Sequence, residues 1–119
     1  MAYKAKGLSM KIIKTQFELT DYLLRNLDES HVSISEKLII CVISGYVNKA
    51  NDWKCWPSLD LLQSKCCATR PTIVKATKGL KSKGILDWEK GRTNIPNKYF
   101  INVKAVGSLV GEEVDYSYK

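Results

Sequence analysis

The sequence lacks any run of about 18 consecutive apolar residues, so we expect no membrane-spanning helix. It also has no N-terminal signal-peptide pattern, so we do not expect its four cysteines to reach an oxidising compartment. Together these absences predict a soluble, reduced, cytoplasmic protein with no membrane partner. A chain of 119 residues has room for one domain of common size.

Groups that carry common catalytic or metal chemistry are also scarce. His31 is the only histidine, and it falls in a predicted loop, where we expect it to be exposed and unpartnered. The cysteines do not show the paired spacing of a zinc site; they are Cys41, Cys55, Cys66 and Cys67. Gly79 and Gly84 are too far apart to form a glycine-rich phosphate loop. We therefore expect no metal, no cofactor and no enzymatic activity.

Acidic residues are missing from one long stretch: none lies between Lys65 and Lys83. Residues 61–104 hold ten basic and two acidic side chains, within a chain of net charge +7. An ordinary solvent-exposed helix mixes both signs, which favours solubility and pairing along the helix. This local excess indicates a negatively charged partner, with a merely solvated basic face as the alternative.

The same stretch predicts two helices joined by a tight turn. Ser58 precedes an apolar run and is a suitable N-cap for the first helix. Residues 66–69 have about the length of a helix-turn-helix corner. Thr69 is placed to cap a second helix over 70–83 with its hydroxyl, and Pro71 is tolerated in the first turn of that helix.

A β-hairpin is predicted directly after the second helix. Gly84 suits the position that ends that helix, and residues 85–90 then read as a strand. Residues 91–97 are rich in turn formers, and residues 98–103 are β-branched and aromatic. The predicted fold class is α+β and mainly helical: a winged helix-turn-helix with a three-helix core and a C-terminal β-hairpin wing.

Several motifs carry a resemblance to a known family. They are Trp-Pro-Ser-Leu-x-x-Leu at 56–62, Thr-Arg-x-Thr-Ile at 69–73, Gly-Ile-Leu at 84–86 and Asn-Lys-Tyr at 97–99. The stretch from about Ser33 to Val103 resembles the winged helix-turn-helix domains of plasmid and phage replication proteins. Those domains are similar to bacterial winged-helix transcription regulators of the GntR and MarR kind. The chain departs from the pattern at Cys66-Cys67, where glycine is common, and at Pro71, where a polar residue is usual.

The resemblance implies sequence-specific binding of double-stranded DNA, in replication initiation of a plasmid or phage. A transcription regulator with the same fold is one alternative, and a winged-helix module that binds proteins is another. A homodimer and other replication proteins are possible further partners.

The expected DNA-binding residues lie on the second helix and on the wing. On the outer face of the helix they are Arg70, Thr72, Val74, Lys75 and Lys78, with Arg70 suited to guanine, Val74 to a thymine methyl and Lys78 to phosphate. On the wing they are Lys90, Arg92, Thr93, Asn94 and Lys98, with Arg92 at the minor groove. Ser58 is expected to meet a phosphate at the start of the first helix.

The remaining chain is expected to support this unit. Residues 1–14 are predicted to form a flexible basic arm, 15–104 the domain, and 105–119 a C-terminal tail with room for a short extra element. Within the domain we expect an extended segment over 16–19, a short helix over 22–26 capped by Thr20-Asp21, and a buried helix over 35–49 that starts after Ser33 or at Ser35. We expect Gly45 to mark a close helix contact, and residues 48–55 to form a loop. The predicted core consists of Leu38, Val42, Tyr46, Leu59, Leu62, Ile73, Leu80, Ile85, Trp88, Phe100 and Ile101.

Overall fold

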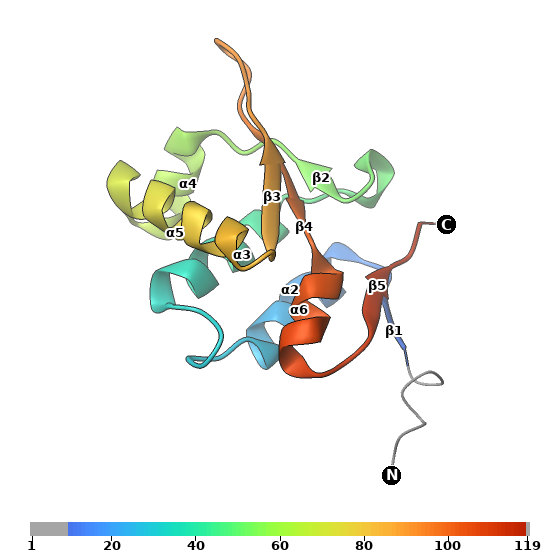
Figure 1. Cartoon of the computed structure of the whole chain (residues 1–119). Helices are drawn as coiled ribbons and strands as arrows, with labels where there is room; N and C mark the ends of the chain where they lie inside the picture. The colour runs from blue at the N-terminus through green and yellow to red at the C-terminus, as the bar shows by residue number, and fades with distance from the viewer. Residues whose placement is uncertain (1–9, 119) are drawn as a thin grey trace.

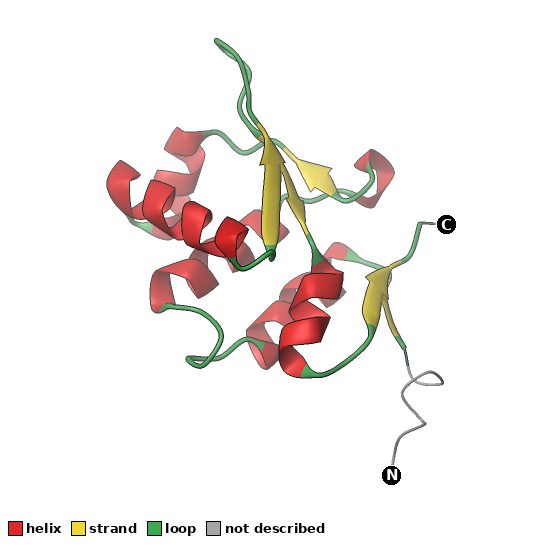
Figure 2. Cartoon of the chain, in the orientation of Figure 1, coloured by secondary structure: helices red, strands yellow, loops and turns green. Residues whose placement is uncertain are grey.

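The computed structural model describes residues 10–118, which form five α-helices, one 3-10 helix and five short strands (Figure 1). The strands are β1 (Lys11–Ile13), β2 (Lys54–Cys55), β3 (Leu86–Glu89), β4 (Lys98–Ile101) and β5 (Val114–Tyr116). The helices are α2 (Gln16–Asn26), α3 (Ile34–Ser44), the 3-10 helix η1 (Lys49–Asn51), α4 (Leu59–Cys66), α5 (Arg70–Ser82) and α6 (Val103–Val110). Helical residues far outnumber strand residues, as Figure 2 shows, which confirms the α+β, mainly helical class.

Capping boxes set the start of the first two helices. Thr15 accepts the backbone N–H of Glu18, and the Glu18 side chain accepts the backbone N–H of Thr15. This reciprocal cap starts α2 at Gln16, so the prediction of an extended segment over 16–19 and a short helix capped by Thr20-Asp21 is wrong. Ser33 and Glu36 form the same box at the start of α3.

Helix α3 ends earlier than predicted. It stops at Ser44, and Gly45 is its C-cap; Gly45 is exposed, and its carbonyl accepts a hydrogen bond from the Gln16 side chain of α2. Asn48 then adopts an extended backbone and caps η1 by accepting the N–H of Ala50. The segment predicted as a plain loop therefore contains η1 and β2, because Asn48 starts a new local structure and Lys54–Cys55 pairs with β4.

Helices α4 and α5 form the predicted helix pair. Ser58 Oγ accepts the Leu61 N–H at 3.0 Å, which confirms the cap of α4. Thr69 has the extended backbone of an N-cap, but its side chain caps no backbone N–H; its hydroxyl lies 3.2 Å from that of Thr72. Cys67 ends α4 with φ of 53°, in the left-handed region that glycine normally occupies.

Strands β3 and β4 form the predicted antiparallel hairpin, and β2 adds a third strand on the other side of β4. The register places Trp88 opposite Tyr99, and Asp87 opposite Phe100. Because alternate residues point to opposite faces of a sheet, Trp88 and Tyr99 share one face, and Asp87 and Phe100 share the other. The hairpin loop extends well beyond the rest of the molecule (Figure 1).

The two ends of the described chain meet in a second small sheet. Strand β1 pairs in parallel with β5, with Lys11 opposite Val114 and Ile13 opposite Tyr116. The described part of the predicted arm, residues 10–14, therefore contains β1, whereas residues 1–9 lie outside the described part. The predicted boundary at 104/105 falls inside α6, so the tail contains that helix and β5, because Asn102 caps α6 and Val114 and Tyr116 are buried.

The core joins the helices to both sheets. Five of the predicted core residues are buried: Leu62, Ile73, Leu80, Ile85 and Ile101. Leu38 is exposed because α3 turns its 39, 40 and 43 positions inward instead, and Tyr46 is exposed in the turn that follows the end of α3. Four others are half-buried at the core margin: Val42, Leu59, Trp88 and Phe100. Trp53, from the segment predicted as a loop, is fully buried and donates from its indole Nε1 to the Ser117 carbonyl at 2.9 Å.

Candidate nucleic-acid interface

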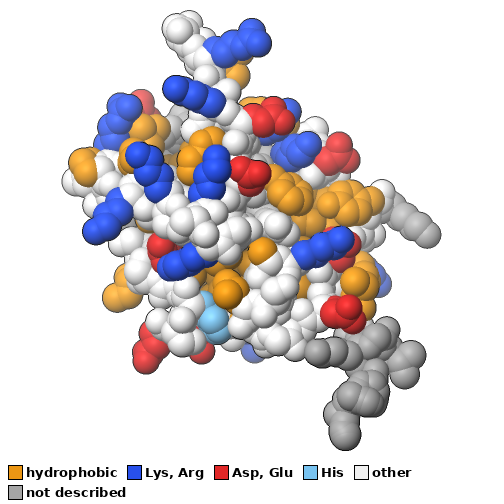
Figure 3. Space-filling model, in the orientation of Figure 1, with side chains coloured by type: hydrophobic (Ala, Val, Ile, Leu, Met, Phe, Trp, Pro, Cys, Tyr) orange, Lys and Arg blue, Asp and Glu red, His pale blue; other side chains and the backbone are white. Residues whose placement is uncertain are grey.

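A groove runs between α5 and the β3–β4 hairpin. It has a volume of about 490 Å³ and a partly apolar lining that includes Ile73, Trp88 and Tyr99. Among residues 10–118, the charged side chains that line it are all cations: Arg70, Lys78, Lys90 and Arg92. In Figure 3 the Lys and Arg side chains gather over α5 and along the hairpin. The groove is therefore a positively charged channel with apolar surface at its base.

The spacing of residues on α5 directs one side of the helix into this groove. Ile73, Ala76, Thr77 and Leu80 face the core and are buried. Arg70, Val74 and Lys78 follow each other at intervals of four residues, so they lie on one side of the helix. All three line the groove beside the hairpin. Three of the five residues predicted on this helix thus line the groove.

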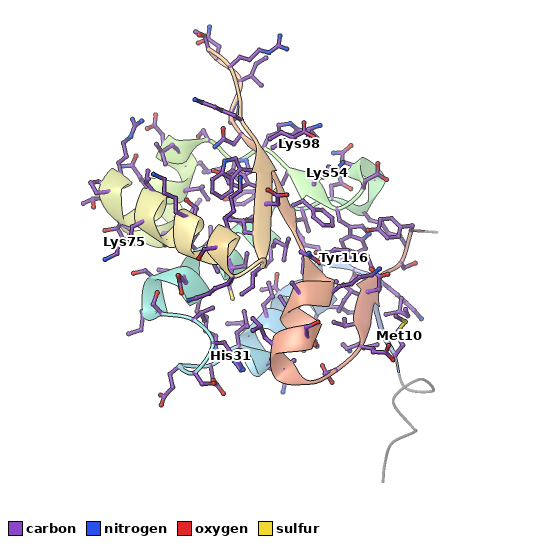
Figure 4. All side chains as sticks on the ribbon, in the orientation of Figure 1. Met10, His31, Lys54, Lys75, Lys98 and Tyr116 are labelled. Carbon is purple, nitrogen blue, oxygen red and sulfur yellow. The ribbon has the colours of Figure 1, made fainter. Side chains whose placement is uncertain are left out.

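Thr72 faces a different hollow. It lines a cavity of about 910 Å³ between α5 and the residues at the start of α3, together with His31, Ser33 and Ser35. Lys75 lines this cavity and also a shallow hollow that it shares with Arg70, Val74 and Lys78. Lys75 therefore lies on the crest of the helix between the two hollows (Figure 4), whereas Thr72 lies away from Arg70 and the hairpin.

His31 has a defined environment near this second cavity. Its Nδ1 accepts the backbone N–H of Asp28 at 3.1 Å and lies 3.3 Å from a carboxylate oxygen of Asp28. Its side chain is 17% exposed. The expectation of an exposed, unpartnered histidine is wrong, because the loop after Asp28 folds His31 back onto that residue.

The hairpin tip is a tight turn over residues 92–95. The Ile95 N–H donates to the Arg92 carbonyl at 2.9 Å, and Asn94 has φ of 67°. Below the turn the Gly91 N–H donates to Asn97 Oδ1 at 2.8 Å. The two sides of the loop are so close that a Cβ on Gly91 would lie 2.0 Å from the Ile95 carbonyl oxygen. This geometry holds Thr93 and Asn94 at the exposed end of the loop.

Lys98 does not reach the groove. Its Nζ lies 3.3 Å from Glu89 Oε1 and 5.9 Å from the centroid of the Trp56 ring. Figure 4 shows Lys98 beside the hairpin strands on the side away from α5. Of the three cations predicted on the wing, Lys90 and Arg92 line the groove, and Lys98 is paired on the opposite face because the strand register turns it there.

Ser58 caps α4 and keeps a hydrogen-bond donor of its own. Its Oγ already accepts the Leu61 N–H, but the hydroxyl proton remains available for an acceptor such as a phosphate oxygen. Pro57, the residue before it, lines the groove. The start of α4 is thus close to the groove.

Two aromatic residues of the groove were not expected there. Trp88 was predicted only as core, and Tyr99 only as part of a strand; their ring centroids lie 5.9 Å apart. Lys81 Nζ lies 4.4 Å from the Trp88 ring centroid and 3.6 Å from Asp87 Oδ1. Burial raises the pKa of the Tyr99 hydroxyl above its usual value. Aligning the two predicted strands would have placed both rings on the face that meets α5.

The described residues offer little for a metal. Among residues 10–118, no group of three or more His, Cys, Asp or Glu side chains is arranged to hold a metal ion. The four cysteines are free, and burial raises the pKa of the Cys55 thiol to about 12. In the same part of the chain, every helix is too short or too polar to cross a membrane.

Comparison with known proteins agrees with this geometry. A family model described as a helix-turn-helix domain matches residues 33–86, from the cap of α3 to the first residue of β3. Residues 33–86 therefore contain a helix-turn-helix. Its two characteristic helices are α4 and α5, and α3 supports them. No match to the chain was found among the curated proteins or among the solved structures.

Proposed function

We propose that this helix-turn-helix binds double-stranded DNA in a sequence-specific manner, with α5 in the major groove and the β3–β4 hairpin as a wing. The observation that carries the proposal is the groove between them, lined by four cations and, within the described residues, by no carboxylate. DNA carries a dense row of phosphates, and neutralising them releases condensed counterions, which supplies much of the binding free energy. An α-helix such as α5 fits the width of the major groove.

The side of α5 that faces the hairpin supplies the proposed base contacts. Arg70 at the first turn is exposed and has the planar fork that pairs with two acceptors of guanine. Val74, one turn further on, offers a methyl-bearing surface to a thymine methyl group. Lys75 lies on the crest of α5 and enters the major groove of the DNA with Arg70 and Val74, whereas Lys78 reaches a phosphate. Thr72, on the other side of the helix, contacts the phosphates of the far strand.

The hairpin supplies a second set of contacts. Arg92 enters or flanks the minor groove, where a narrow groove concentrates negative potential and favours arginine. Thr93 and Asn94 lie at the tip beside it, and Lys90 holds a flanking phosphate. Ser58 donates its free hydroxyl proton to a phosphate near the start of α4. Lys98 contributes less than first expected, because binding DNA would require it to leave Glu89.

The biological role that we favour is replication initiation of a plasmid or phage, in the cytoplasm and together with other replication proteins. The motifs from Trp56 to Tyr99 support this role through their resemblance to replication proteins of mobile elements. Transcription regulation uses the same fold and remains the alternative. Selecting bound fragments from random DNA, and locating the selected sequence at an origin or at a promoter, would distinguish the two roles.

The test of DNA binding is a salt titration of the wild type, Arg70→Ala, Lys78→Ala and a control, Lys49→Ala. Lys49 is an exposed cation on η1, outside the lining of the groove. Arg70→Ala should relax base preference at one position, at a cost of about 1–3 kcal/mol on the selected site. Lys78→Ala should weaken all sequences alike and reduce the slope of log K against log salt by about one unit.

Lys49→Ala should leave both quantities unchanged. If all four proteins bound equally, or bound without any salt dependence, the proposed docking would be wrong.

A further inference from the structure

Helices α2 and α3 expose large apolar side chains to an unusual degree. Ile34 is 89% exposed and Phe17 78%, and Leu24 and Leu38 are 52% and 44% exposed. Isolated exposed apolar residues are ordinary on protein surfaces, but a contiguous set of large ones marks an interaction site. The first question is therefore whether these four residues form one face.

The contacts between α2 and α3 show that they do. The two helices run antiparallel, because Thr20 Oγ1 lies 2.6 Å from Ser44 Oγ and Lys37 Nζ donates to the Leu27 carbonyl at 2.6 Å. Phe17 and Leu24 are seven residues apart on α2, and Ile34 and Leu38 are four apart on α3, so each pair follows one side of its helix. Each pair lies outward of the seam between the helices. The four side chains thus form one apolar face, which we call the α2–α3 face.

The two most exposed residues occupy diagonally opposite corners of the α2–α3 face. Phe17 lies in the first turn of α2, beside the end of α3, as the hydrogen bond from Gln16 to the Val47 carbonyl at 3.3 Å indicates. Ile34 lies at the start of α3, beside the end of α2. A twofold axis that lies in the plane of this face, at right angles to the line from Phe17 to Ile34, brings the faces of two copies together and exchanges these two corners. It would therefore place Phe17 of one copy over Ile34 of another, twice.

The charges around the α2–α3 face favour the same occupant. The charged side chains of its helices that are not buried are Glu18, Asp21, Arg25 and Lys37, which sum to zero. Two copies can approach through this neutral face without the repulsion that opposes contact between their basic α5 sides. A strongly charged partner would gain no attraction here.

We propose that a second copy of this chain docks on the α2–α3 face, in a twofold dimer in which Phe17 of each copy packs on Ile34 of the other. Such an isologous contact is the commonest arrangement of soluble homodimers. An 11-residue helix is only about 16 Å long at about 1.5 Å per residue, so two of them present a small interface. It is smaller than the roughly 800 Å² per partner of a stable complex, so the dimer is weak and reversible. The inference does not depend on DNA binding, because the face lies outside the groove.

The test is sedimentation velocity over a concentration series, with thermal melting of each variant to check folding. The wild type should pass reversibly from monomer to dimer. Phe17→Lys and Ile34→Glu should each weaken the dimer about tenfold or more, because each change places a charge in both of the symmetry-related apolar contacts. The chain carrying both changes should regain much of the lost affinity, because residue 17 of one copy then pairs with residue 34 of the other as Lys and Glu. Leu109→Ser, which removes an exposed apolar residue from α6, should have no effect.

Three results would overturn the proposal. The wild type could remain monomeric at every concentration up to its solubility limit. A dimer could form that neither single change weakens. The doubly changed chain, folded by its melting curve, could be as weak as the single variants, which would mean that residues 17 and 34 do not meet. Recovery of affinity in the doubly changed chain would also exclude nonspecific association, because nonspecific association does not depend on opposite charges at residues 17 and 34.

Discussion

Gly79 of α5 lies against Glu36 of α3 so closely that position 79 has no room for a side chain. A Cβ built on Gly79 would lie 2.0 Å from Glu36 Oε2. The Glu36 carboxylate cannot simply swing aside, because its other oxygen accepts hydrogen bonds from Lys83 Nζ and from the Ser33 backbone N–H. The absence of a side chain at Gly79 thus lets the buried Glu36 of α3 pack directly against α5.

Replacing Gly79 with alanine should therefore destabilise the protein. Alanine in a helix interior is ordinarily favoured over glycine by about 1 kcal/mol. Here it must displace Glu36 and weaken hydrogen bonds to a charged group, which are worth about 1.5–3 kcal/mol. We expect a net loss of about 1 kcal/mol, measured by urea denaturation. A gain equal to the usual alanine effect would mean that Glu36 moves freely.

The Glu36–Lys83 pair should make stability depend on pH in the acid range. Burial alone would raise the pKa of Glu36, but the hydrogen bonds from Lys83 and Ser33 and the charge of Lys83 outweigh it and leave the pKa below its usual 4.5. Because the folded pKa is the lower one, the contribution is complete above pH 4.5 and is lost as pH falls through the folded value. Unfolding followed by circular dichroism between neutral pH and acid should show this loss.

Glu36→Gln is the matched variant for that measurement. It keeps the size of the side chain and removes its charge, so it should lower stability at neutral pH by about 1–3 kcal/mol. It should also flatten the pH dependence of stability below 4.5. An equally steep acid transition in the variant would assign it to other carboxylates.

Replacing Cys67 with glycine should make the protein more stable. Its φ of 53° places it in the left-handed region, which costs a residue with a Cβ about 1–2 kcal/mol. Glycine removes this cost but gains entropy in the unfolded chain, so Cys67→Gly should stabilise by a net amount of about 0.5–1 kcal/mol. Cys66→Gly is the contrast, because Cys66 is helical and buried and should lose stability when changed. The midpoints of urea unfolding curves give both values.

Gly91→Ala should disturb the hairpin tip without unfolding the domain. Its Cβ would meet the Ile95 and Pro96 carbonyl oxygens, at 2.0 and 2.6 Å, so the loop must open. The residues affected are exposed or half-buried, so the free energy of unfolding, measured with urea, should fall by less than about 1 kcal/mol. If the hairpin acts as a wing, DNA affinity should fall as it does for Arg92→Ala. Equal DNA affinity of the wild type and Gly91→Ala would remove the tip from the binding surface.

Leu62 and Leu38 give opposite predictions for the same substitution. Leu62 of α4 is fully buried in the core, so Leu62→Ala should lower the free energy of unfolding by about 2–5 kcal/mol. Leu38 is 44% exposed, so Leu38→Ala should cost less than about 1 kcal/mol in the monomer. Thermal and urea unfolding at low protein concentration would compare them. Similar losses would show that α3 had been given the wrong rotation.

The sequence predicted well wherever local signals agreed with one another. Ser58 before an apolar run, Pro71 in a first turn and Gly84 after a basic helix located α4 and α5 almost to the residue. Near α2 the predicted cap was Thr20-Asp21, and Thr15 was not recognised as one. The decisive feature was the reciprocal Thr15–Glu18 box, which only the spacing of three residues reveals.

Other features depended on pairings across the chain and could not be deduced locally. Lys54–Cys55 becomes a strand because β4 lies beside it, and a two-residue strand has no periodicity to detect. Lys98 was assigned to the DNA-binding residues of the wing by its charge, but its register opposite Glu89 turns it to the face away from α5. Leu38 was assigned to the core by hydrophobicity, although a helix that is apolar over most of its girth does not reveal which side faces inward.

The pairing of β1 with β5 has a consequence for how the protein is made. A ribosome adds residues at about 5–20 per second, so β1 waits about 5–20 s for a partner that is synthesised roughly 100 residues later. During this interval α2, α3 and the helix-turn-helix can emerge and pack, because their contacts are close in sequence. Closure of the small parallel sheet, with the Trp53 indole hydrogen-bonded to the Ser117 carbonyl, must therefore follow the synthesis of β5. The nascent chain would thus be able to form its positively charged groove before β1 and β5 pair.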